Sequence, residues 1–214
     1  MKKLFALLLS FILLVSALPL AGAFSDDASI DDGFKKAVAA MSDAKIIGGF
    51  TDGSFKPTET LTRAQAAKIL CTMLEGEKAE ALTKTETGFA DVPATHWAAK
   101  YVAYCVDKGI VAGVGGGKFD PDGKLSSGAF AKMLLVAYQK GDAAGYTGAE
   151  WLKNVQSAAE KTFYNYHLDK GPTGDPMPRQ EAAQLAFNAS FQAEADADKA
   201  KGDPRTFTPR CRRP

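Results

Sequence analysis

The stretch of sequence that decides the fold runs from residue 46 to residue 57 and reads Ile46-Ile47-Gly48-Gly49-Phe50-Thr51-Asp52-Gly53-Ser54-Phe55-Lys56-Pro57. It recurs 64 positions later, where residues 110–121 read Ile110-Val111-Ala112-Gly113-Val114-Gly115-Gly116-Gly117-Lys118-Phe119-Asp120-Pro121. An echo of this kind indicates one structural unit that is used more than once. Glycines and a proline interrupt both copies, so each copy predicts a turn-rich loop.

The sequences that flank the two loops correspond as well. Before the loop, Phe24-Ser25-Asp26 in the first copy matches Phe89-Ala90-Asp91 in the second. After the loop, Leu61-Thr62 matches Leu125-Ser126. The repeated unit is therefore longer than the loop and includes the segments on both sides of it.

A third and weaker copy follows the second. It starts near Tyr146 and ends with Arg179-Gln180-Glu181-Ala182-Ala183, where the first copy has Arg63-Ala64-Gln65-Ala66-Ala67. In its middle, Gly171-Pro172-Thr173-Gly174 stands in place of the loop. We therefore expect two clear repeats and a degenerate third.

Apolar residues on each side of the loops recur with the period of an α-helix. The stripes before the loops are Ile30, Phe34, Ala37, Val38 and Met41 in the first copy, Trp97, Tyr101, Val102, Cys105 and Val106 in the second, and Trp151, Val155, Ala158, Ala159 and Phe163 in the third. The stripes after the loops are Ala66, Ile69, Leu70, Met73 and Leu74 in the first copy and Phe130, Met133, Leu134 and Ala137 in the second. Each copy thus predicts a helix, a loop and a second helix.

Polar residues mark where several of these helices begin. Thr62 with Gln65 three residues later is a capping box, in which each side chain accepts a hydrogen bond from the backbone N–H of the other residue. Ser126 is placed to cap the corresponding helix of the second copy. Thr147 with Glu150 predicts another capping box in the third copy.

A single pair of helices is too small to bury much of a core. Three pairs around a shared axis would bury one, so the sequence predicts an all-α fold of three helix-loop-helix repeats in a pseudo-threefold arrangement. We expect repeat 1 at residues 24–75, a linker at 76–88, repeat 2 at 89–140, a degenerate repeat 3 at 141–190, and a polar, mobile tail at 191–214.

The first 23 residues have the pattern of a signal peptide. Lys2 and Lys3 precede a long apolar run, and Ala21-Gly22-Ala23 is a small-x-small cleavage site. An uncleaved membrane anchor is the alternative, but Pro19 just before the cleavage site favours removal. We expect an exported chain that starts at Phe24 and has no membrane span, because no later stretch is long and apolar enough to cross a bilayer.

Composition and charge exclude several classes of protein. The chain has 214 residues, of which 46% are hydrophobic and 24% charged, as is typical of a globular protein. Removal of the two signal lysines changes the net charge from +1 to −1, which argues against a nucleic-acid binder. Three cysteines cannot form a disulfide framework. Cys71 and Cys105 lie on apolar stripes and are either inert buried thiols or a disulfide, whereas Cys211 lies in the expected tail.

The motifs for a cofactor, a metal or catalysis are incomplete. Asp120-Pro121-Asp122-Gly123 suggests a calcium loop, but Lys118 and Ala129 stand where such a loop needs oxygen ligands. The glycine-rich stretch 113–118 matches neither a dinucleotide fingerprint nor a phosphate-binding loop. Two histidines and no nucleophile motif leave no catalytic constellation. We expect no cofactor, no metal and no enzyme.

Taken together, the motifs resemble S-layer homology repeats. The shared features are a Phe-x-Asp start, a Trp-Ala helix, an Asp-Gly-x-Phe-x-Pro loop and a Thr-Arg-Ala-Glu-type helix start, seen here as Phe89-Ala90-Asp91, His96-Trp97-Ala98, Asp52-Gly53-Ser54-Phe55-Lys56-Pro57 and Thr62-Arg63-Ala64-Gln65. The resemblance covers Phe24 to about Ser190. It implies a three-pronged, helix-rich module that holds an exported protein at the cell wall or cell surface without a covalent bond.

The resemblance also implies a ligand, a secondary cell-wall polysaccharide that often carries pyruvate ketals. A ketal carboxylate is an anion that an arginine at a helix N-terminus binds through charge-assisted hydrogen bonds. An indole face packs on the apolar side of a sugar ring. The ligand-binding residues that the resemblance indicates are Arg63, Thr62, Gln65, Trp97, Asp91 and Arg179.

The match to the family is incomplete. Gln65 replaces the usual glutamate, Ser126-Ser127 in the second copy lacks the arginine, and the first copy has no tryptophan. One groove is therefore expected to bind well, and at least one of the others is expected to be purely structural. Both Arg63 and Trp97 also have a structural alternative. Arg63 can be a solvated or salt-bridged cation, and Trp97 can be a core residue.

Two functions from different classes follow. The first is non-covalent anchoring to the cell envelope through wall polysaccharide. The alternative is an exported structural or protein-interaction subunit that self-assembles or binds protein partners without polysaccharide. Binding to polysaccharide-bearing cell walls distinguishes the first from the second, which predicts assembly that depends on protein concentration alone.

Overall fold

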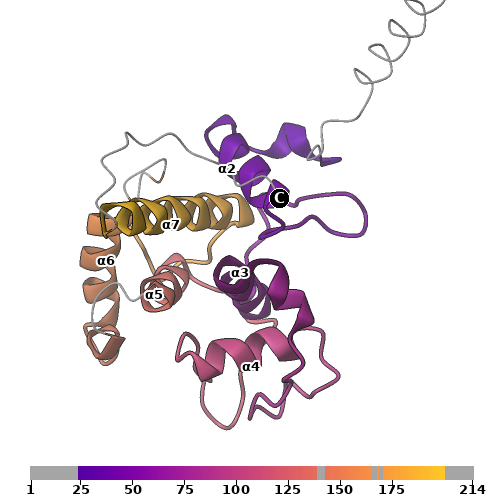
Figure 1. Cartoon of the computed structure of the whole chain (residues 1–214), viewed down its shortest axis with the longest axis vertical. Helices are drawn as coiled ribbons and strands as arrows, with labels where there is room; N and C mark the ends of the chain where they lie inside the picture. Colours follow the sequence, from indigo (N-terminus) through magenta and orange to yellow (C-terminus); the bar gives the residue numbers. More distant parts are fainter. Residues whose placement is uncertain (1–23, 139–142, 165–167, 169–170, 201–214) are drawn as a thin grey trace, which may run out of the picture.

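The computed structural model describes residues 24–138, 143–164, 168 and 171–200 (Figure 1). The expected signal peptide at 1–23 lies outside the described residues, as do residues 201–214 of the expected tail, with Cys211. The domain boundaries and the pseudo-threefold arrangement of three repeats stay predictions.

Six α-helices lie in the part of the chain that the structure describes. They are α2 (Asp32–Asp43), α3 (Arg63–Glu75), α4 (Ala99–Asp107), α5 (Ser127–Ala137), α6 (Trp151–Thr162) and α7 (Arg179–Ala200). Shorter 3-10 helices are η1 (Asp27–Ser29), η2 (Gly76–Ala81) and η3 (Ala143–Tyr146). The same residues contain isolated β-bridges and no strand, which confirms the prediction of an all-α class.

Some helices pack against the next helix in the sequence, and others pack against helices that are far away in the sequence. The helix α3 contacts α4, and α5 contacts α6, while the long α7 contacts both α2 and α5 (Figure 1). The last helix of the described chain therefore packs on the first. It also continues to Ala200, into the segment from residue 191 that was expected to form a polar, mobile tail.

Two predicted helix caps are present. The Thr62 hydroxyl accepts a hydrogen bond from the Gln65 N–H at 3.3 Å, and the Gln65 side chain accepts one from the Thr62 N–H at 3.1 Å. This is the complete capping box expected at the start of α3. The Ser126 hydroxyl caps α5 by accepting from the Ala129 N–H at 3.2 Å. Both helices thus begin where the local sequence dictates.

The capping box predicted at Thr147 is wrong. The helix α6 begins at Trp151, and its N-cap residue Glu150 makes no side-chain capping bond. Gly148 has a φ of +73°, so the backbone turns between the two residues and the helix starts later than expected. The Thr147 hydroxyl instead donates to the Ala144 carbonyl at 2.7 Å.

A ring of three backbone hydrogen bonds lies at the centre of the fold. The N–H of Leu61 donates to the carbonyl of Met177, that of Met177 to Leu125, and that of Leu125 back to Leu61, each at 2.9 Å. All three side chains are buried. Since these residues stand just before α3, α5 and α7, the ring holds the starts of three helices around one point.

Aromatic pairs close the two repeated loops over the core. Phe55 and Phe119 are completely buried, and their rings lie 5.1 Å and 5.5 Å from those of Phe24 and Phe89. A Cβ atom on Gly113 would lie 2.7 Å from the Phe89 ring and from a backbone oxygen. The close approach of this aromatic pair to the loop therefore requires a glycine there.

Candidate functional site

Two predicted arginines occupy equivalent positions and both bind a loop of another repeat. Arg63 is the first residue of α3, and Arg179 is the first residue of α7. The Arg63 Nε donates to the Phe119 carbonyl and its Nη2 to the Ala112 carbonyl, both at 2.8 Å. The half-buried Arg63 thus fastens the first repeat to the loop of the second.

Arg179 makes the same contacts one repeat away. Its Nε donates to the Phe55 carbonyl and its Nη2 to the Gly48 carbonyl, both at 2.9 Å. The guanidinium carbon lies 4.8 Å from the centre of the Phe50 ring and 4.9 Å from that of Phe55. Burial lowers the pKa of Arg179 to about 10, which leaves the side chain charged at neutral pH.

Asp91, another predicted ligand-binding residue, binds the backbone of the second loop. Its carboxylate accepts hydrogen bonds from the N–H groups of Phe119 at 2.8 Å and Asp120 at 2.7 Å. The Phe119 hydrogen bond is the largest cause that keeps the pKa of Asp91 below its ordinary value. Asp26 does the same for the first loop, through the N–H groups of Phe55 and Lys56. Both oxygens of Asp91 therefore have a structural task.

The third equivalent position has a serine in place of the arginine. Ser127, at the start of α5, accepts a hydrogen bond from the Thr173 N–H at 2.8 Å through its hydroxyl. The next residue, Gly128, donates its N–H to the Thr173 carbonyl at 2.8 Å. A Cβ on Gly128 would lie 2.5 Å from Leu152, so the segments are tightly packed here. This junction holds the chain together without a cation.

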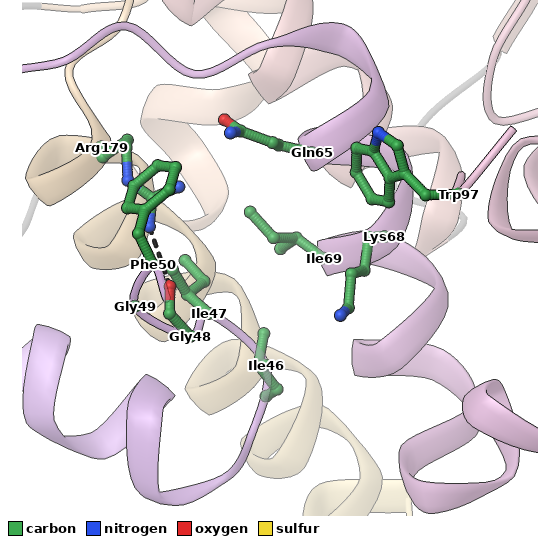
Figure 2. Close-up of a pocket in the computed structure, with 10 residues that line it drawn as sticks. All are labelled: Ile46, Ile47, Gly48, Gly49, Phe50, Gln65, Lys68, Ile69, Trp97 and Arg179. Atoms are coloured by element: carbon green, nitrogen blue, oxygen red, sulfur yellow. Dashed lines mark hydrogen bonds between the residues drawn. The ribbon is translucent and has the colours of Figure 1, made fainter. Parts of the chain in front are cut away.

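A groove of about 150 Å³ lies where the first loop, α3, Trp97 and the start of α7 meet (Figure 2). Its lining residues are Ile46, Ile47, Gly48, Gly49, Phe50, Gln65, Lys68, Ile69, Trp97 and Arg179. Figure 2 shows Trp97 on the side opposite Arg179 and Phe50. Three of the six predicted site residues, Gln65, Trp97 and Arg179, are thus brought together from α3, the turn before α4 and the start of α7.

Trp97 differs from its expected place in a helix. The helix α4 begins at Ala99, so Trp97 lies in the turn before it. The residue is 54% exposed, which excludes the alternative of a core tryptophan. An exposed indole on the wall of a groove provides a flat apolar surface with one N–H donor at its edge.

Gln65 and Lys68 stand one turn apart on α3 and give the groove its polar side. The Gln65 amide reaches from α3 toward the wall that holds Arg179 (Figure 2). Lys68 was missed by the sequence reasoning, although its i+3 spacing from Gln65 places both residues on one face of a helix. Phe50 was missed too, because no local pattern shows which residues face a groove.

The other three predicted residues do not line this groove. Thr62 caps α3, and Asp91 binds backbone N–H groups of the second loop. Arg63 donates hydrogen bonds to backbone carbonyls of that same loop. Among the described residues no cluster of three or more His, Cys, Asp or Glu side chains could hold a metal ion. Within that same part of the chain, no helix has the length and apolar character to cross a membrane.

The two cysteines on the packed helices are free thiols. Cys71 on α3 and Cys105 on α4 are both completely buried, and the structure has no bond between them. The Cys105 thiol donates to the Ala67 carbonyl at 3.4 Å. Burial raises the pKa of Cys71 to about 11 and that of Cys105 further. Neither thiol is a candidate nucleophile.

Comparison with known proteins gives a consistent set of similarities. The family model of the S-layer homology domain matches residues 23–67 and 88–131. The chain is 33% identical over 158 residues to the surface-layer 125 kDa protein of Lysinibacillus sphaericus, covering 71% of this chain and 13% of that protein. It is 32% identical over 194 residues to the S-layer protein EA1 of Bacillus anthracis, covering 89% of this chain and 22% of that protein.

A third relative has a name that describes a role. The cellulosome-anchoring protein of Acetivibrio thermocellus is 32% identical over 97 residues, which cover 45% of this chain and 22% of that protein. The chain therefore spans less than a quarter of the length of each of these three relatives.

Proposed function

This chain is an S-layer homology domain protein, and we propose that it attaches to the cell wall without a covalent bond, through the groove between Arg179 and Trp97. Relatives named for surface layers and for anchoring a cellulosome support a location at the cell surface and an anchoring role. They favour a structural protein over an enzyme.

The observation that carries the proposal is the pairing of an exposed indole with cations across one groove. Trp97 offers a flat apolar face, and Arg179 and Lys68 bring positive charge to the same groove. Sugar rings pack on aromatic faces, and carboxylates bind guanidinium and ammonium groups. The ligand class that combines both features is a polysaccharide with acidic groups. We propose a secondary cell-wall polysaccharide with pyruvate ketals, whose carboxylate approaches the Arg179 side.

In this proposal the anionic ligand is attracted by the cations that line the groove and not by the net charge of the protein. Two Arg179 nitrogens already bind carbonyls of the first loop, so the ligand meets a guanidinium that is fixed in place before it arrives. The expected mature chain has a net charge of −1 and provides no general attraction for an anion. Affinity then depends on the few cations in the groove rather than on the overall field.

A sedimentation assay tests the anchoring role. Mature protein should pellet with cell walls that carry their polysaccharide and stay in solution with walls from which the polymer has been extracted. Trp97→Ala should weaken binding about tenfold, and because the side chain is exposed, the fold should be unaffected. Val114→Ala is the matched control, since it removes an exposed apolar side chain on the second loop, outside the groove.

Two results would contradict the proposal. Unchanged pelleting after extraction of the polymer would show that the polysaccharide is not the ligand. Equal binding by the Trp97 variant and the wild type would show that the groove is not the site. Size-exclusion chromatography over a range of protein concentrations would then test the alternative, self-assembly without polysaccharide.

A further inference from the structure

Lys68 is the more loosely held of the groove's two cations. We propose that it is the second anion-binding group and that Glu80 competes with the ligand for it, so that Glu80 limits the affinity of the groove. This inference rests on the proposed function. It adds a residue outside the groove that sets the strength of binding.

The geometry of Lys68 leaves it able to move. Its Nζ lies 3.7 Å from Glu80 Oε1, within ion-pair distance but beyond a hydrogen bond, and 5.5 Å from the centre of the Tyr101 ring. Its side chain is 43% exposed. Arg179, in contrast, is buried and tied to two carbonyls. The groove therefore combines one fixed cation with one cation on a flexible stem.

Glu80 is held firmly by other partners. Its Oε1 accepts a hydrogen bond from the Tyr101 hydroxyl at 2.7 Å, and its Oε2 accepts one from Lys100 Nζ at 2.9 Å. Lys100 Nζ also donates to the Glu80 carbonyl at 2.7 Å. These bonds, that of Tyr101 first, keep the pKa of Glu80 below its ordinary value, so the carboxylate is charged at neutral pH. Glu80 keeps these partners whether or not Lys68 stays beside it.

The charges in this cluster do not balance. Lys68 and Lys100 share the single carboxylate of Glu80, and Lys100 has the shorter contacts. One positive charge is in excess, and Lys68 carries it at the groove. An anionic ligand that binds Lys68 has two costs. The ammonium group must give up part of its attraction to Glu80, and the ligand's negative charge must come close to the Glu80 carboxylate, which repels it. Replacing the carboxylate by a neutral group removes both costs.

Binding of purified wall polysaccharide by the mature protein tests this, with the polymer used both intact and after chemical reduction of its carboxyl groups to alcohols. Glu80→Gln should lower the Kd for the intact polymer about fivefold, the effect of one unit charge about 4 Å away in water. Lys68→Gln should raise the Kd by a similar factor. In the Lys68→Gln background, Glu80→Gln should have much less effect. Glu77→Gln is the matched control, because Glu77 lies in the same 3-10 helix and pairs with Lys45 instead.

The outcomes separate this inference from the proposed function. If the wild type fails to bind the intact polymer, the proposed function falls and the inference with it. If the wild type binds but Glu80→Gln binds equally or more weakly, only the role of Glu80 is overturned. An effect of Glu80→Gln that is as large on the reduced polymer as on the intact one would also overturn it. Should circular dichroism show Glu80→Gln to be unfolded, the exposed Lys68→Gln variant decides, and an unchanged Kd would refute the inference.

Discussion

Replacement of Arg179 by alanine should destabilise the whole fold, beyond any effect on ligand binding. Arg179 is 4% exposed, and its guanidinium joins α7 to the first loop, 131 residues earlier in the sequence. The variant removes both hydrogen bonds to the carbonyls of Gly48 and Phe55. It also removes the contact of the guanidinium with two aromatic rings and leaves a space beneath Phe50.

The size of the loss follows from these contacts. A hydrogen bond from a charged donor contributes about 1.5–3 kcal/mol, and a cation over an aromatic ring about 0.5–1 kcal/mol. Because such contributions are not fully additive, we expect a loss on the order of 3–5 kcal/mol. That is a large part of the 5–15 kcal/mol by which a domain is typically stable. Arg63→Ala should cost less, on the order of 2–3 kcal/mol, since Arg63 is only half-buried and contacts one ring.

Urea unfolding followed by circular dichroism measures this difference. Lys36→Ala serves as the control, because Lys36 is exposed on α2 and should change the free energy of unfolding by less than about 0.5 kcal/mol. Arg179→Lys should recover only part of the loss. A lysine keeps the positive charge, but its single ammonium group cannot reach both carbonyls in the way a guanidinium does. If Arg179→Ala lowered the free energy of unfolding by no more than Lys36→Ala, the structural role assigned to this arginine would be refuted.

Three further predictions concern the packing of the chain. Leu125→Ala should lower the free energy of unfolding by about 2–5 kcal/mol in urea titrations, because a fully buried side chain at the central ring is lost; a loss below 1 kcal/mol would contradict that role. Since the pKa of Asp91 is lowered from 3.8 in the folded chain, its contribution to stability is present above that pH and is lost as the pH falls through the folded value. The melting temperature should therefore fall less steeply between about pH 5 and pH 2 for Asp91→Asn than for the wild type. Parallel curves would show that the hydrogen bonds of the Asp91 carboxylate to the second loop do not contribute to stability. Cys71 and Cys105 should resist a disulfide reagent such as DTNB at about pH 8 in the folded protein and react after unfolding. Rapid labelling of either thiol in the native state would contradict the packing of α3 against α4.

Features that depend on neighbouring residues were predicted well from the sequence. The capping box of Thr62 and Gln65 needs only residues three apart, and it forms as expected. The box at Thr147 failed because a glycine with positive φ between its two members changed the direction of the backbone.

The candidate site could be predicted only in part. Arg179 was found because its position in the repeat matches that of Arg63, but the residues it binds, Gly48 and Phe55, are more than 120 residues away in the sequence. Lys68 had no signal beyond its spacing from Gln65. Trp97 was expected within a helix, and its exposure depends on where α4 begins.

The all-α class and the repeated helix-loop-helix unit could both be predicted before the fold was known, because the recurrence after 64 residues, the helical periodicity and the capping residues are visible in the order of the residues. Which segments contact one another became clear from the folded chain. One groove is lined by Arg179 at the start of α7, by the first loop and α3, and by Trp97 before α4. Asp91 and Arg63 bind the second loop instead. These residues are far apart in the sequence and come together only on folding, so no local pattern along the chain predicts which of them line the groove.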